Sequence, residues 1–315
     1  MKRHRSGALV WAAVFGVAAT ASAQEAPFSP LEAGRFGAAP ATAAATTTRA
    51  LRMGAGGDGV ALGFEVFGGY GLRVTTPEGA ESSWFHAFTL GRAHLAAQGR
   101  WGDGRGRVVL EALRSAGDGA LVGVGGDSLV LRLREAYGAW ARGLVEVRAG
   151  VVPTLVIPEV EGTWRLRAVA PTPLEATALA APADLGMTAR VALPRGYGWA
   201  GLGVFNGEGY AQRELNRGKN TELAVLLRPF PRGALAPLSA LVAYQLGSSG
   251  TGLSRADRLH AALLWQGEAL RAGITWSYAW GVEDDSARRS WLAEAFVRGA
   301  FGPYLRVGAR LSLWQ

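Results

Sequence analysis

The fold class is indicated most clearly by one segment, Leu270-Arg271-Ala272-Gly273-Ile274-Thr275-Trp276-Ser277-Tyr278-Ala279-Trp280. Its even-numbered positions are all apolar or aromatic, whereas positions 271 to 277 on the odd parity carry arginine, glycine, threonine and serine. Because successive side chains of a strand point to opposite faces, this alternation predicts a β-strand with one apolar and one polar face. The same pattern recurs at 60–75, 143–151 and 302–314.

The alternating segments follow one another at short intervals. Turn signals such as Asp58-Gly59, Asp103-Gly104 and Pro194-Arg195-Gly196 separate them. We predict strands at 60–75, 84–100, 105–115, 129–141, 143–151, 185–194, 197–206, 219–229, 237–247, 255–266, 268–280, 289–299 and 302–314, with a further short strand at 46–54.

Composition excludes several other classes. The chain has 315 residues, 45 of them glycine and none cysteine, so it has neither a disulfide framework nor a thiolate metal site. This much glycine disfavours a large helical protein. The formal net charge is +8, and Lys2 and Lys219 are the only lysines. The arginines are spread along the chain without a basic cluster or a known nucleic-acid module, so we expect no nucleic-acid partner.

The first 23 residues read as an export signal. Lys2, Arg3 and Arg5 precede an apolar run from Ala8 to Ala19, which is too short to span a bilayer as a helix. Small residues at 21–23 predict cleavage after Ala23; a retained anchor helix is the alternative. We expect an Ala/Thr/Pro-rich lead-in at 24–48 and a β-barrel at 49–315.

Export and two-faced strands together indicate an all-β protein, a transmembrane antiparallel β-barrel of the bacterial outer membrane. Closed barrels pair every backbone group in lipid and have an even strand number, so we predict about 14 strands, within a range of about 12 to 16. The apolar parity would contact outer-membrane lipid. A soluble secreted β-sandwich or β-helix is the alternative, since it also gives alternation.

In such a barrel the polar parity faces the interior. The predicted pore-lining residues are Arg73, Arg92, Arg132, Arg134, Arg148, Arg190, Arg271, Arg298, Arg306 and Arg310. Acidic residues of the same parity are fewer: Glu65, Glu111, Glu146, Glu222 and Glu294. An excess of arginine favours anions. Alternatively, these arginines brace the wall in ion pairs, and we expect Glu146 to pair with Arg148, and Glu294 with Arg298.

One connection is unusually long. Residues 152–184 contain several prolines and a helix-compatible patch at 174–181. Loops of this length usually have a function, so we predict that this one folds into the barrel as a constriction. Its charged residues are Arg165, Arg167, Glu159, Glu161 and Glu175. The alternative is a loop on the outside of the cell.

Four short motifs resemble the phosphate-selective porin O/P family. They are Leu133-Arg134-Glu135-Ala136-Tyr137, Val147-Arg148-Ala149-Gly150-Val151-Val152-Pro153, Ala183-Asp184-Leu185-Gly186-Met187 and Leu202-Gly203-Val204-Phe205-Asn206-Gly207-Glu208-Gly209. Their order matches the family over about a third of the chain. The resemblance implies an anion-selective outer-membrane porin of about 16 strands that forms a homotrimer.

The expected function is passive diffusion of small, preferably anionic solutes, phosphate among them, through an arginine-lined interior. The alternatives are a non-conducting structural or adhesion barrel and a transporter for a hydrophobic solute. We expect no enzyme, cofactor or metal. His86 and His94 share a predicted strand, but no third ligand stands at metal spacing.

Overall fold

The structure, a computed structural model, describes residues 10–17, 51–53, 59–75, 83–114, 129–167, 171–211, 217–282, 284–302 and 305–315. Strands dominate the described chain, which confirms the prediction of an all-β protein. The predicted lead-in at 24–48 lies outside the described residues. So does the predicted signal peptide, except for the strand β1 (Val10–Val17).

Thirteen strands form the body of one large sheet. They are β3 (Gly59–Thr75), β4 (Ser83–Trp101), β5 (Gly104–Arg114), β6 (Leu129–Arg142), β7 (Val145–Pro153), β8 (Ala183–Leu193), β9 (Gly198–Phe205), β10 (Asn220–Leu227), β11 (Leu238–Leu246), β14 (Asp257–Gln266), β15 (Leu270–Val282), β16 (Asp285–Phe301) and β17 (Leu305–Trp314). Each corresponds to a predicted strand. The short β2 (Leu51–Met53) falls within the predicted strand at 46–54.

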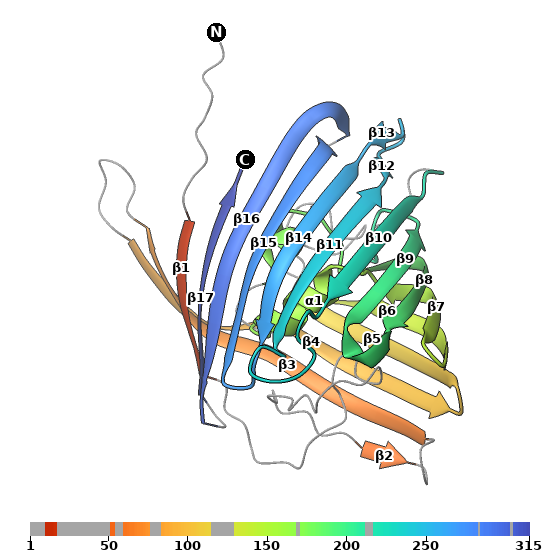
Figure 1. Ribbon diagram of the computed structural model, residues 1–315. Coiled ribbons are helices and arrows are strands. Elements are labelled where there is room, and N and C mark those ends of the chain that lie inside the picture. Colours follow the sequence, from red (N-terminus) through yellow and green to blue (C-terminus); the bar gives the residue numbers. More distant parts are fainter. Residues whose placement is uncertain are drawn as a thin grey trace.

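The sheet is an antiparallel meander in which strands adjacent in the chain are also paired in space. β1 pairs with β17 and β2 with β3, so these two strands are the outer edges of a fifteen-stranded sheet. Within the described residues, no pairing joins β1 to β2. A separate small hairpin, β12 (Ser248–Ser249) with β13 (Ser254–Arg255), extends the connection after β11. Figure 1 shows the sheet curling around the helix α1 (Ile157–Trp164).

The two faces of the sheet differ in an unusual way. On β15 the apolar Leu270, Ile274 and Trp276 are 48%, 62% and 40% exposed, whereas Arg271 and Thr275 are buried. The same division holds along most described strands, with charged residues on the side of α1, called here the inner face. A water-soluble sheet buries its apolar face and exposes its polar one, so this arrangement is inverted.

The long connection between β7 and β8 lies against the inner face. We call its described parts, residues 154–167 and 171–182, the inner segment; it contains α1 and the four-residue α2 (Pro173–Ala176). α1 contacts β14, β15 and β16. Trp164 meets the ring of Phe296 edge-on at 5.5 Å between centroids. The apolar cluster there includes Leu155, Ile157, Val160, Trp164, Leu174, Leu226, Leu264 and Leu292.

α1 was not predicted from the sequence. Pro158 counted as a loop signal, but proline is tolerated in the first turn of a helix, where its missing N–H costs no bond. Glu159 also lies in that first turn, where an acidic side chain favours the helix dipole. The helix ends at Arg165, whose φ of 50° is left-handed. The predicted helical patch at 174–181 is helical only in α2.

Among the described residues, no helix has the length and hydrophobicity needed to cross a membrane.

Candidate functional site

The polar residues of β4, β5 and β6 meet on the inner face because of strand register. His94 is paired with Glu111 across β4 and β5, and Glu111 with Arg132 across β5 and β6. Arg92 and Arg134 stand on the same face of the neighbouring strands. Residues two apart on a strand share a face, so the alternation in sequence brings these side chains together.

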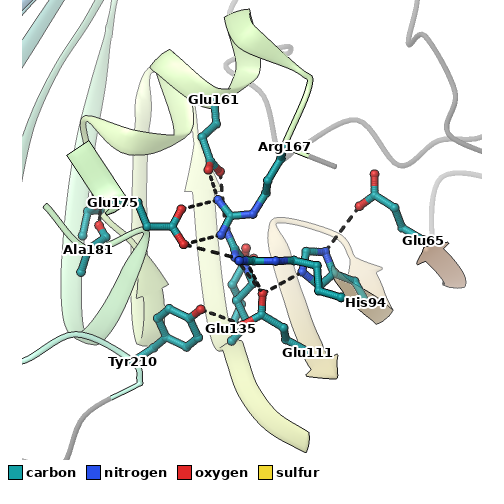
Figure 2. A network of polar contacts seen from close by, with 12 residues as sticks. Glu65, His94, Glu111, Glu135, Glu161, Arg167, Glu175, Ala181 and Tyr210 are labelled. Carbon is teal, nitrogen blue, oxygen red and sulfur yellow. Dashed lines mark hydrogen bonds and ion pairs between the residues drawn. The ribbon is translucent and has the colours of Figure 1, made fainter. Parts of the chain in front are cut away.

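Glu111 is the centre of this arrangement and is fully buried. Five groups lie within hydrogen-bonding or ion-pair distance of its carboxylate: the Tyr210 hydroxyl at 2.7 Å, Arg92 Nη1 at 2.8 Å, Arg132 Nε at 3.0 Å, His94 Nε2 at 3.1 Å and Arg134 Nη1 at 3.4 Å. We call these six residues the Glu111 network (Figure 2). A buried carboxylate is stable only with such partners, so the side chains of the network depend on one another for their stability.

A β-bulge on β6 enlarges the network. The register shifts between Val109 and Leu110 of β5, where two residues of β6 stand in place of one. Arg134 and Glu135 are therefore both largely shielded, although they are adjacent in sequence, and Glu135 accepts a hydrogen bond from Arg107 Nε at 2.8 Å. A strict alternation would place Glu135 on the opposite face from Arg134, so the sequence alone did not predict that these two residues share a face.

The inner segment is tied to these strands by ion pairs. Arg167 pairs with Glu161 and Glu175 within the segment. Glu161 lies 3.6 Å from Arg134, and Glu175 lies 3.9 Å from Arg92. Figure 2 shows Arg167 between the two segment glutamates, close to the Glu111 network. Burial, with the positive charges of Arg134 and Arg92, lowers the pKa of Arg167 to about 10.

Tyr210 reaches the network from the connection after β9. Its hydroxyl donates to Glu111, and the guanidinium of Arg132 lies over its ring at 5.0 Å from the centroid. Burial is the main cause that raises the pKa of the Tyr210 phenol, and the Glu111 carboxylate adds to it. The phenol therefore stays protonated and remains a donor. Nothing in the spacing of Tyr210, far along the chain from Glu111, indicated this contact.

A second group of charges continues along β7 and β8. Glu146 pairs with Arg148, as predicted, and with Arg105 of β5. Arg190 lies over the ring of Trp199 at 4.1 Å, and 3.5 Å from Glu159 of α1. These predicted pore-lining arginines are thus on the inner face, but each has an acidic partner.

The predicted arginines of β15, β16 and β17 have a different environment. Arg271 Nη1 donates to Gly162 O at 2.8 Å, Arg306 Nη1 to Gly302 O at 2.7 Å and Arg310 Nη1 to Pro171 O at 2.6 Å. Each of these three arginines therefore donates to a backbone carbonyl of a turn or of the inner segment.

The predicted pair of Glu294 with Arg298 is wrong. Glu294 pairs instead with Arg310, whose Nε lies 3.7 Å from its carboxylate. The two residues of the predicted pair are four apart on one strand, which separates them by roughly 13 Å. Arg310 lies one strand away, opposite Phe296, and is much nearer. The pairing follows from register, which alternation alone does not give.

Two predicted positions have side chains that the structure does not describe. Arg73 lies on β3 and His86 on β4, both in parts of the strands where only the backbone is described. His94 contacts two carboxylates, with Nδ1 3.4 Å from Glu65 and Nε2 3.1 Å from Glu111. In the described part of the chain, no three histidine, aspartate or glutamate side chains form a possible metal site.

The sequence matches no protein-family model, and no curated protein is significantly similar to it. The resemblance to the phosphate-selective porins therefore stays a prediction.

Proposed function

We propose that this chain is an outer-membrane β-barrel that lets small solutes, preferably anions, diffuse through an interior narrowed by the inner segment. The observation that carries this proposal is the inverted burial of the sheet. Leucine, valine, isoleucine and tryptophan side chains are exposed along many neighbouring strands, while arginines and glutamates are buried behind them. An apolar surface of that extent is costly in water and favourable in lipid.

Closure of the sheet belongs to the same proposal. An edge left unpaired in lipid would cost several kcal/mol for each backbone group, so a spanning sheet must close. β2 runs antiparallel to β3, whereas β17 lies twelve antiparallel pairings along from β3 and therefore runs parallel to it, so β2 and β17 run in opposite directions. Pairing of the β2 region with β17 would give an even, antiparallel barrel of about 14 strands. β1 occupies that edge of β17 in the structure, and in this proposal β1 is removed with the predicted signal peptide.

The preference for anions rests on the half-buried charges. The fully buried arginines and carboxylates of the described residues are balanced in number. The half-buried ones on the inner face and inner segment are not, since arginines outnumber glutamates. They are Arg92, Arg100, Arg105, Arg107, Arg132, Arg165, Arg167, Arg306 and Arg310 against Glu65, Glu135, Glu159, Glu161 and Glu175. Charges that keep contact with water bias which ions enter.

Planar-bilayer recording tests the proposal. In a KCl gradient, the purified protein is expected to give discrete steps in current. The sign of its reversal potential should be the one that chloride preference produces. Arg132→Ala with Arg134→Ala should move that potential toward zero. Cation preference in the wild-type protein would contradict the proposal.

A non-conducting barrel is the second candidate, and one observation favours it. The inner segment contacts both halves of the inner face, through apolar packing on β14 to β16 and through ion pairs to β4, β6 and β8. Replacing residues 155–179 with a Gly/Ser linker separates the two candidates. Under the first, conductance is present before the change and larger after it; under the second, it appears only after it.

The third possibility from the sequence, a passage for hydrophobic solutes, has less support. Leu292 and Phe296 could line an apolar path, but they are buried in the cluster that contains Trp164 of α1. The chain's own segment occupies the space that such a solute would need.

A further inference from the structure

Three neighbouring turns of the sheet carry the same two residues at their tips. They join β6 to β7, β8 to β9 and β10 to β11, and we call residues 142–144, 194–197 and 228–237 the Arg-Gly turns. The tips are Arg142-Gly143, Arg195-Gly196 and Arg232-Gly233. All three arginines are exposed, and the glycines have left-handed φ angles of 61°, 83° and 81°. Turn geometry therefore accounts for the glycines but not for the arginines.

The Arg-Gly turns lie side by side at one end of the sheet. β6 to β11 are consecutive in the sheet, so neighbouring turns are two strands, or about 10 Å, apart. Backbone hydrogen bonds link each turn to the next strand pair. Ala192 N donates to Leu144 O at 2.8 Å, and Arg228 N donates to Tyr197 O at 2.8 Å. Because the Debye length is about 8–10 Å at moderate ionic strength, the charges of adjacent turns act together.

These turns form a bounded positive patch. They contain four arginines, with Arg228 as the fourth, and no acidic residue. No described residue forms a hydrogen bond or an ion pair with the side chains of the three exposed arginines. The turns on either side do contain an acidic residue, Asp103 between β4 and β5 and Glu268 between β14 and β15. The patch therefore differs from the inner face, where glutamates offset many of the arginines.

Arg195 is held in a backbone conformation that suits glycine better. Its φ is 58° and its ψ is 16°, which is the left-handed region. A residue with a Cβ is disfavoured there, and Gly or Asn is the usual choice at such a turn position. Backbone strain of this kind is concentrated at positions that have a function. The conformation of Arg195 therefore indicates that its charged side chain is required at this tip.

An exposed apolar side chain follows each of the three arginines within three residues. Leu144, Tyr197 and Leu235 are 47%, 45% and 46% exposed. Three residues of extended chain span at most about 10 Å, and lipid headgroups extend roughly 5–8 Å beyond the hydrocarbon on each side of a bilayer. In a sheet whose apolar face contacts lipid, the three arginines lie near the depth of the lipid phosphates, within reach of their long side chains.

We propose that the Arg-Gly turns bind the phosphate groups of anionic phospholipids in the leaflet next to these turns. The inference rests on the proposed outer-membrane barrel, in which short turns belong to the periplasmic side and hence to the inner leaflet. The guanidinium fork matches a phosphate with paired hydrogen bonds. A phospholipid also brings acyl chains to the exposed apolar residues beside the arginines, which a free phosphate ion lacks. The occupant is therefore a lipid.

Lipid competition on the detergent-purified full chain tests the proposal. The protein is mixed with equal amounts of phosphatidylglycerol and phosphatidylethanolamine that have the same acyl chains, and bound lipids are counted by native mass spectrometry. The wild type should retain phosphatidylglycerol about tenfold or more over phosphatidylethanolamine, because each arginine near an anionic lipid adds several-fold to binding. Combining Arg142→Gln, Arg195→Gln and Arg232→Gln should reduce the preference below about threefold. Equal retention by the wild type would overturn the proposal and favour an acidic protein as the partner.

The matched control removes three exposed cations from the opposite end of the strands. Arg217→Gln, Lys219→Gln and Arg289→Gln together change the net charge by the same amount. This variant should keep the preference of the wild type. An equal loss of preference in the two triple variants would refute the site, because net charge alone would then explain the binding.

Arg195→Gly separates a role in lipid binding from a role in the turn. Glycine suits the left-handed φ, so the thermal midpoint should not fall, while the preference for phosphatidylglycerol should. An unchanged preference would contradict a lipid contact at Arg195. Insertion into phosphatidylcholine vesicles, measured by protection from trypsin, tests the barrel separately. Insertion without lipid preference overturns only the lipid site, whereas failure to insert with or without phosphatidylglycerol overturns both.

Discussion

Glu111→Gln is the sharpest test of the inner face, because one carboxylate serves five partners. Removing one partner of a buried charge pair costs about 3–5 kcal/mol, since the remaining charge stays buried and unpaired. The side chains of Arg132 and Arg92 are 31% and 18% exposed and can turn toward water, whereas that of Arg134 is 9% exposed and cannot. We therefore expect the free energy of unfolding to fall by an amount near the lower end of that range, about 3 kcal/mol. This is about a hundredfold in the folding equilibrium.

The assay is urea unfolding in detergent micelles, followed by tryptophan fluorescence and extrapolated linearly to water. Glu65→Gln is the matched control. Glu65 contacts the same His94, but its side chain is 37% exposed, so its loss should cost less than about 1 kcal/mol. Arg134→Met added to Glu111→Gln should restore part of the stability, because it removes the stranded charge. Equal losses in the two glutamine variants, or a loss below about 1 kcal/mol in Glu111→Gln, would refute the assignment of Glu111 as the centre of the network.

Three further changes probe other elements. Trp164→Ala removes a buried ring from the apolar cluster and should cost about 3–5 kcal/mol and speed proteolysis of the inner segment; unchanged digestion would contradict the packing of α1. The difference between the ultraviolet pH titrations of the wild type and Tyr210→Phe should show a phenol that keeps its proton above the ordinary pKa of about 10, and a midpoint at or below that value would exclude the buried contact. Gly281→Ala should cost more than about 1 kcal/mol, because φ is +77° and a Cβ would lie 1.5 Å from the carbonyl oxygen of Arg255, whereas Gly252→Ala has open space and should be neutral. Gly281 lies where the register of β15 with β16 shifts between Trp280 and Val282, and similar midpoints for the two variants would contradict this backbone geometry.

The strands were predictable because their signal is local. Side chains on a strand alternate with a period of two whatever the partner strand is, so β15 could be located from residues 270–280 alone. The ends of strands and the short β2 were also close to their predicted positions. The glycines and prolines of the turns marked these strand ends, and they too influence only the backbone within a few residues.

The features that the sequence did not reveal depend on distant parts of the chain. The bulge that brings Arg134 and Glu135 to one face exists only in the pairing of β5 with β6. Tyr210 meets Glu111 because the connection after β9 returns to the inner face. α1 was hidden by reading Pro158 as a loop signal, and the Pro-Glu sequence at 158–159 is the local signal that could have revealed it.

Strand register also decides which arginines are paired with a carboxylate. Arg298 and Arg310 have the same parity, and the sequence gives no reason to treat them differently. Pairing of β16 with β17 gives Arg310 a glutamate and leaves Arg298 with unsatisfied donors beside other arginines. Most arginines of β4 to β8 are offset in the same way by partners such as Glu111 and Glu146. The arginine count of the chain therefore says little about selectivity, because an anion responds only to the positive charge that remains after the arginines of the inner face have paired with its carboxylates.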